Sequence, residues 1–184
     1  MRALVVVPAI AALALFQTSA ANGAVMSLGG PLSSNCYRAA LSNDGRAAAV
    51  DGCTRALEQE PLSLTDRAAT LVNRGIVHMS AGRSDAADAD FDAALRLNAD
   101  LPDGWLNKGF LRLRQGQGRE ALPLIQKGIE AGADHQALAI FARGVAHEQM
   151  GHYGAAYNDL KLAQKLEPRW KLPGEYLASY QIRR

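Results

Sequence analysis

The chain has little of several residue types on which particular functions depend. Its 184 residues include two cysteines and four histidines, and only 6% are aromatic. The 20 Lys+Arg nearly balance the 18 Asp+Glu, and the net charge of +2 excludes a strongly basic nucleic-acid binder and an acidic-tail protein. Apolar residues, alanine prominent among them, make up 48% and exclude general disorder. Because alanine favours helices and has a small side chain, we expect closely packed helices.

A membrane-spanning hydrophobic run is also missing. The apolar run at positions 3–16 has about 14 residues, whereas roughly 20 are needed to cross a bilayer. It follows Arg2 and is followed by small residues, which is the pattern of a secretory signal peptide. We expect residues 1–20 to be a signal peptide that is cleaved after Ala20, which leaves no membrane span. The alternatives are a cut after Ala21 or Ala24, an uncleaved anchor, or a buried helix.

The rest of the chain repeats itself. Gly75, Gly109 and Gly144 are 34 and 35 residues apart, and each follows a basic residue. Another glycine follows each of them, then an alanine, a large apolar residue and a small residue, always at the same offsets. These four columns hold Gly82, Gly116 and Gly151; Ala87, Ala121 and Ala156; Phe91, Ile125 and Leu160; and Ala94, Gly128 and Ala163. Self-similarity at this interval predicts stacked structural repeats.

Each block predicts two antiparallel helices. In the first block, helical stretches at 71–81 and 84–97 flank a break at Gly82. Gly75 lies within the first stretch, where glycine costs about 1 kcal/mol relative to alanine. We expect that it lets the second helix lie against the first, with Phe91 filling the space between them. One such pair cannot bury its apolar face alone, so the pairs must stack.

These columns resemble the tetratricopeptide repeat over about residues 68–170. The resemblance implies an all-α fold, a right-handed superhelix of stacked antiparallel helix pairs. Its parts would be a degenerate N-terminal repeat at 30–63, full repeats at 68–101, 102–135 and 137–170, and a C-terminal capping helix at 171–184. We expect the capping helix to carry Tyr176 and Tyr180, and residues 61–65 to link the first two repeats.

The two cysteines fall in the degenerate repeat. Cys53 takes the large apolar position of the second helix, and Cys36 lies on the first helix at nearly the same distance from the turn at Gly45. In an antiparallel pair the two should face each other. In an oxidising compartment such a pair is a candidate disulfide, so we predict a Cys36–Cys53 bond; the alternative is two buried free thiols.

The resemblance places a peptide-binding groove on the concave side, which the first helices of the repeats line. The groove residues would be Val72, Asn73, Ile76, Leu106, Asn107, Phe110, Leu113, Arg114, Phe141 and Val145. Most are apolar, and contiguous exposed apolar surface usually marks a binding site. Asn73 and Asn107 share one column, in which some family members hold a peptide backbone, because an amide is both donor and acceptor. Asparagine is also simply common in that column.

Two further points limit what this groove would do. The column that carries lysine or arginine in family members that clamp a chaperone's terminal carboxylate is apolar here, so carboxylate capture lacks its main attraction. The groove could also be covered by the C-terminal helix or by a neighbouring molecule.

No constellation of residues indicates catalysis, a cofactor or a metal. His147 and His152 are five residues apart and flank Gly151, which fails the i, i+4 spacing of a zinc-protease helix. His78 and His147 share a column and are interpreted as packing residues. The acidic run at 85–92 is interpreted as a solvated helix start, and the arginines at 67, 74 and 83 as scattered.

The sequence therefore predicts a non-catalytic scaffold that binds a peptide or helical segment of a protein partner in a periplasm-like space. It predicts neither nucleic acid nor a cofactor as partner. The rival from another class is a structural subunit of a cell-envelope assembly, held by its edges. An enzyme is less favoured because no catalytic cluster is found.

Overall fold

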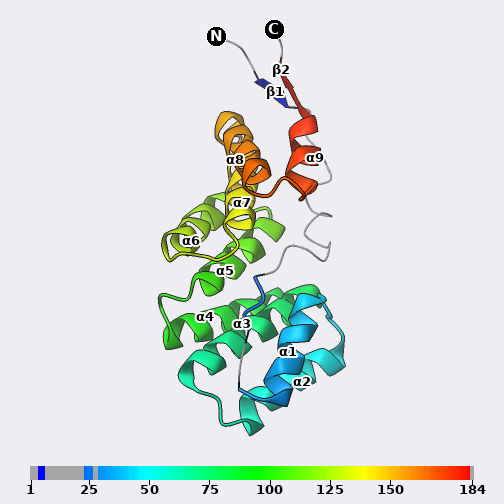
Figure 1. Ribbon diagram of the computed structural model, residues 1–184, viewed down its shortest axis with the longest axis vertical. Helices are drawn as coiled ribbons and strands as arrows, with labels where there is room; N and C mark the ends of the chain where they lie inside the picture. The colour runs from blue at the N-terminus through cyan, green and yellow to red at the C-terminus, as the bar shows by residue number, and fades with distance from the viewer. Residues whose placement is uncertain (1–3, 7–22, 27–28, 183–184) are drawn as a thin grey trace.

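The computed structural model describes residues 4–6, 23–26 and 29–182. These residues form nine helices and one short pair of strands (Figure 1). The helices are α1 (Pro31–Leu41), α2 (Ala47–Gln59), α3 (Leu64–Ser80), α4 (Ser84–Leu97), α5 (Pro102–Arg114), α6 (Gly118–Glu130), α7 (Gln136–Gln149), α8 (Tyr153–Leu166) and α9 (Leu172–Ala178). The strands β1 (Leu4–Val6) and β2 (Tyr180–Ile182) are antiparallel, with Val5 opposite Gln181. The all-α repeat solenoid predicted from the sequence is confirmed.

The helices are arranged as four consecutive hairpins that stack along the long axis of the molecule (Figure 1). α1 and α2 form the first hairpin, and α9 lies beside α8 at the far end. In the three full repeats the turn glycines Gly82, Gly116 and Gly151 have φ values of +74°, +74° and +75°. This left-handed conformation is costly for a residue with a Cβ, which explains why the column holds glycine.

The mid-helix glycines are required for a different reason, the close approach of two helices. A Cβ on Gly75 would lie 2.4 Å from Cε1 of Phe91, and one on Gly109 would lie 2.6 Å from Cγ1 of Ile125. Phe91 and Ile125 are themselves fully buried. In these two repeats the large apolar residue of the second helix therefore occupies the space that the missing side chain leaves on the first helix.

Two elements differ from the sequence-based expectation. α3 begins at Leu64 because the hydroxyl of Ser63 accepts a hydrogen bond from the Asp66 amide at 3.1 Å and caps the helix. The linker to the first full repeat is therefore shorter than expected. At the other end α9 stops at Ala178, and Tyr180 belongs to β2 rather than to the capping helix.

Two hydrophobic clusters make up the core. One joins the disulfide hairpin to the first full repeat, reaching from Cys36 to Leu111. The other joins the second and third full repeats to the C-terminal segment, reaching from Leu106 to Tyr180. Because the clusters overlap along α5, the middle repeat connects the two halves of the molecule.

The predicted export signal falls mostly outside the described residues. β1 lies within the predicted signal, whereas residues 1–3 and 7–20 are not described. Of the helices described, none has the length and apolar character to cross a membrane.

Candidate functional site

The concave columns predicted from the sequence lie on α3, α5 and α7, but the side chains are not exposed. Nine of the ten predicted groove residues are buried, and Arg114 is half-buried. The expectation of an exposed apolar surface is therefore wrong. The physical reason is that segments from both ends of the chain pack against this face: Ala24 and Val25 at the α3 end, and Trp170, Tyr176 and Tyr180 at the α7 end.

At the α3 end, Asn73 holds the main chain of Val25 by two hydrogen bonds. The Val25 amide donates to Oδ1 of Asn73 at 2.9 Å, and Nδ2 of Asn73 donates to the Val25 carbonyl at 2.6 Å. Asn73 is fully buried. In a β-sheet, a neighbouring strand likewise forms hydrogen bonds to both the N–H and the C=O of one residue. The side-chain amide of Asn73 therefore makes the two hydrogen bonds that a neighbouring strand would make.

Asn107 continues this row on α5. Its Nδ2 donates to the Gly23 carbonyl at 3.0 Å and to the Asp103 carbonyl at 2.8 Å. Its Oδ1 is buried and has no hydrogen-bond partner among the described residues. The two asparagines therefore bind residues 23 and 25 of one segment, but only Asn73 uses both its donor and its acceptor on that segment.

Gly23 lies close to α5. A Cβ at this position would be 2.8 Å from Oδ1 of Asp103 and 3.3 Å from Nδ2 of Asn107. A side chain at this position would therefore require the Asp103 side chain to move. Burial raises the pKa of the Asp103 carboxyl, and the nearby His135 opposes this rise.

At the α7 end the covering is aromatic. The Phe141 ring centroid lies 5.0 Å from that of Trp170 and 5.0 Å from that of Tyr176, in tilted and edge-to-face arrangements. The hydroxyl of Tyr180 donates to Oε2 of Glu148 at 2.9 Å. Burial raises the pKa of Glu148, and burial together with Glu148 raises the pKa of Tyr176 to about 12.

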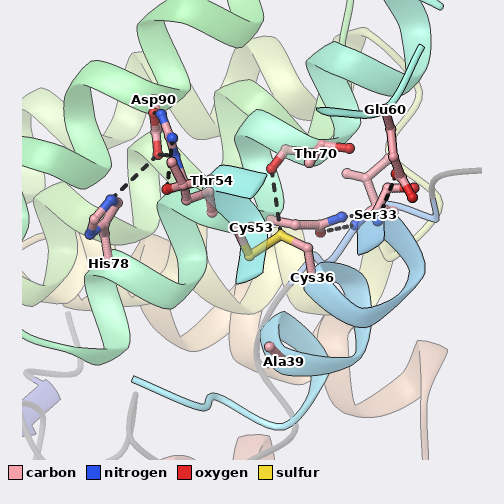
Figure 2. The surroundings of a disulfide bond; sticks show 12 residues. Ser33, Cys36, Ala39, Cys53, Thr54, Glu60, Thr70, His78 and Asp90 are labelled. Atoms are coloured by element: carbon pink, nitrogen blue, oxygen red, sulfur yellow. Dashed lines mark hydrogen bonds and ion pairs between the residues drawn. A yellow bond between two sulfur atoms is a disulfide. The ribbon is translucent and has the colours of Figure 1, made fainter. Parts of the chain in front are cut away.

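The first hairpin contains a disulfide between Cys36 and Cys53, the pairing predicted from the sequence (Figure 2). The two Cα atoms are 4.7 Å apart and both residues are buried. The Cys36 sulfur also lies 3.9 Å from the Thr70 carbonyl oxygen of α3. Glu60, which directly follows α2, accepts hydrogen bonds from the amides of Leu32 and Ser33 at 2.7 and 2.9 Å and thereby caps the N-terminus of α1.

A pattern of ion pairs joins the helices within two of the repeats, and sequence reasoning missed it. Arg74 forms a bidentate ion pair with Asp90, in which Nε and Nη2 lie 2.9 and 2.7 Å from the carboxylate oxygens. Arg143 forms the same bidentate pair with Asp159, at 2.9 and 2.8 Å. Each of these arginines directly precedes a mid-helix glycine, and each aspartate follows its arginine by sixteen residues. This shared spacing is the sequence signal by which the pairs could have been predicted. The interpretation of the acidic run as solvated is wrong for Asp90, which is buried against Arg74.

The middle repeat departs from this pattern. Its basic residue is Lys108, but the position sixteen residues later is Leu124. Lys108 pairs instead with Asp92, and with Asp88 at 3.6 Å, while Arg112 pairs with Asp88 at 2.6 Å. These carboxylates lie on α4, so the basic residues of the middle repeat bind the repeat before it.

The two histidines of the shared column lie beside the same aspartates. Nε2 of His78 is 3.8 Å from Oδ2 of Asp90, and Nε2 of His147 is 4.0 Å from Oδ2 of Asp159. Figure 2 shows His78 pointing toward Asp90. Burial lowers the pKa of both histidines, and the neighbouring aspartate only partly opposes it. Among the described residues, no group of three or more His, Cys, Asp or Glu is placed to hold a metal ion.

A comparison with known families matches the tetratricopeptide repeat at residues 68–101 and 137–169. These two blocks of the chain are tetratricopeptide repeats. The middle block, which this comparison does not match, folds as the helix pair α5 and α6 between the two matched repeats. No curated protein matches the sequence.

Several solved structures share the fold. MamA 41-end from Desulfovibrio magneticus RS-1 is 20% identical, with a TM-score of 0.60, and the match covers 81% of this chain and 83% of that one. The first TPR domain of human RPAP3 is 18% identical, with a TM-score of 0.58 over 62% of this chain and 89% of that domain. The Arabidopsis OM64 TPR domain is 19% identical, with a TM-score of 0.59 over 63% and 95%. At these identities the likeness concerns the fold alone.

Proposed function

We propose that this protein is an exported, non-catalytic scaffold that binds a peptide segment of a protein partner on its concave face, in the bacterial periplasm. Tetratricopeptide repeats generally mediate protein–protein interaction. The fold therefore supports binding as the function, and the concave row of asparagines supports a peptide as the ligand.

One observation carries this proposal. Asn73 makes both a donor and an acceptor bond to the main chain of an extended segment lying across the first helices. Such bonds recognise any extended backbone whose side chains fit, because every residue except proline offers the same amide and carbonyl. An extended segment of a partner would be held at the same place by the same two atoms.

Two features support export. Arg2, the apolar run and the small residues after it have the pattern of a signal peptide. The Cys36–Cys53 bond is a disulfide, and disulfides persist in oxidising compartments but are rare in a reducing cytosol.

The binding proposal is tested by affinity capture from the native compartment, comparing wild type with Asn73→Ala/Asn107→Ala. We expect the double variant to lose the partners that wild type captures. The matched control is Asn158→Ala, because Asn158 is an exposed asparagine on α8, away from the concave face. Phe110→Ala is unsuitable, since Phe110 is a buried core residue whose loss would destabilise the repeat by about 3–5 kcal/mol whether or not it contacts a partner.

The outcome of this capture also decides between scaffold and structural subunit. If the double variant and the Asn158 control retain the same partners, the groove does not bind them. Retention of a cell-envelope assembly by both variants would favour the edge-bound subunit.

Export is tested separately by fractionation and by the mass of the mature chain before and after alkylation. We expect a chain that begins at Ala21 or Asn22 and that gains alkylated cysteines only after reduction. Free thiols in the unreduced protein, or an intact Met1 in the exported fraction, would contradict this part of the proposal.

A further inference from the structure

We infer that residues 23–26 are a built-in ligand of the concave groove, and that a partner peptide must displace them by presenting the same chemistry. That chemistry is an extended backbone with glycine opposite Asn107 and a small aliphatic residue two positions later opposite Asn73. This inference rests on the proposed function and specifies its ligand. Figure 1 shows this segment, which precedes α1 in the chain, passing beside α3 and α5.

The first step is that the contacts are made to the main chain. Three hydrogen bonds join the segment to the asparagine row: two between Val25 and Asn73, and one between Gly23 and Asn107. Since all three use amide or carbonyl groups of the segment, its side chains contribute fit rather than bonding. A peptide from another protein can form the same bonds in the same geometry.

The second step is that the segment leaves the row incompletely satisfied. Oδ1 of Asn107 is buried and unpartnered, whereas Oδ1 of Asn73 accepts the Val25 amide. A buried acceptor without a donor is unfavourable, typically by more than the net gain of one ordinary hydrogen bond. A partner peptide that donates an amide to Asn107 would make one bond more than the resident segment makes.

The third step fixes the side chains that fit. A Cβ at Gly23 would come within 2.8 Å of Oδ1 at the end of the Asp103 side chain, so the position opposite Asn107 favours glycine and admits a larger residue only if Asp103 moves. Ala24 and Val25 pack, half-buried, against the cluster that contains Val72 and Ile76. The following residue, Met26, is exposed. The groove therefore favours binding of a short sequence motif that consists of glycine, a small residue and an aliphatic residue.

The fourth step is the advantage of a resident segment. A ligand tethered by a short linker is present at an effective concentration in the millimolar range. The apparent affinity for a free peptide falls in proportion to the fraction of molecules whose groove is open. Weak peptides are thus excluded, and only a partner with the additional Asn107 bond or further contacts binds.

The experiment measures binding of a fluorescent synthetic peptide, residues 21–28 of this chain, by anisotropy to the purified protein whose first residue is known from its mass. The variants are Val25→Pro, which removes the amide that donates to Asn73, and the matched control Val25→Ala, which keeps it. We expect at least tenfold tighter peptide binding by Val25→Pro than by wild type or the control. Equal binding by Val25→Pro and Val25→Ala would overturn the inference.

Two further arms use the same assay. A peptide with leucine in place of glycine at position 23 should bind Val25→Pro at least tenfold more weakly, and equal binding would refute the glycine requirement. Adding Asn73→Ala to Val25→Pro should abolish binding of the parent peptide, and persistent binding would show that the peptide attaches elsewhere.

Occupancy is also measured without any variant, by hydrogen exchange. The Val25 amide of the wild-type protein should exchange more slowly than an open chain predicts, and unprotected exchange would overturn the inference. If these tests fail while partner capture still depends on Asn73 and Asn107, the proposed function stands and only the resident ligand is wrong. A mature chain that begins at Val25, after a cut behind Ala24, would lack Gly23 and also overturn the inference.

Discussion

The concave face is covered at its α3 end by a few residues of extended main chain and at its α7 end by an aromatic helix. The first covering is held by hydrogen bonds from Asn73 and Asn107, which a competing backbone can replace. The second is held by Phe141, Trp170 and Tyr176, whose packed rings bury apolar area that no short peptide restores. We therefore expect the covering at the α3 end to be displaced more readily than the covering at the α7 end.

The largest expected effect lies at the aromatic end. Phe141→Ala should lower the free energy of unfolding by about 3–5 kcal/mol, because it removes a buried ring and leaves a cavity beneath α9. Chemical denaturation measures it, with Tyr153→Ala, an exposed tyrosine, as control. A loss below 1 kcal/mol would show that α9 is as replaceable as the N-terminal segment.

The disulfide is expected to rank next. Cys36→Ala/Cys53→Ala should lower the free energy of unfolding by about 3 kcal/mol, since the bond closes a loop whose sequence separation is 17. Denaturation with and without a reductant checks this: the reductant should destabilise wild type and leave the double variant unchanged. Equal sensitivity of both proteins would contradict a structural role for the bond.

The hydrogen-bonded segment should matter much less for stability. Val25→Pro should lower the free energy of unfolding by about 1 kcal/mol, because the lost hydrogen bonds are offset by bonds to water and by freedom regained in the chain. The same denaturation series measures it against Val25→Ala. A loss as large as that of Phe141→Ala would remove the distinction between the two ends.

The smallest expected effect is shared by both halves and depends on pH. Burial lowers the pKa of His78 and His147 in the folded state, so the unfolded chain binds more protons just below the ordinary histidine pKa of 6.5. Stability should therefore fall as pH falls from 6.5 toward the lowered values. His78→Gln/His147→Gln should flatten this part of a stability–pH curve, and an unchanged slope would show that neither histidine contributes.

The repeat architecture could be predicted because its determinants are local and recur at fixed spacing. Gly75 and Phe91 fit together within one hairpin, and so do Gly109 and Ile125, so each pair has its physical reason within a few dozen residues. The facing positions of Cys36 and Cys53 followed from the same antiparallel geometry.

The covering of the concave face could not be predicted in the same way. Asn73 was named as a candidate contact, but nothing in the repeat columns indicates that Val25 would be its partner. The segment lies between a predicted signal and the first helix and has no periodicity of its own. The ion pair of Arg74 with Asp90 has a counterpart in Arg143 with Asp159 at the same spacing, but Leu124 stands at this position in the middle repeat, so the acidic column does not recur in all three repeats.

The ion pairs of the middle repeat make the repeats distinct parts rather than interchangeable modules. Lys108 and Arg112 fit the carboxylates of the repeat that precedes them, Asp88 and Asp92, and Leu124 offers no carboxylate within their own repeat. A chain in which the second and third repeats were exchanged would place these cations beside a different set of side chains. The ion pairs between neighbouring repeats therefore favour one order of the repeats, whereas glycine and apolar residues determine the packing within each repeat.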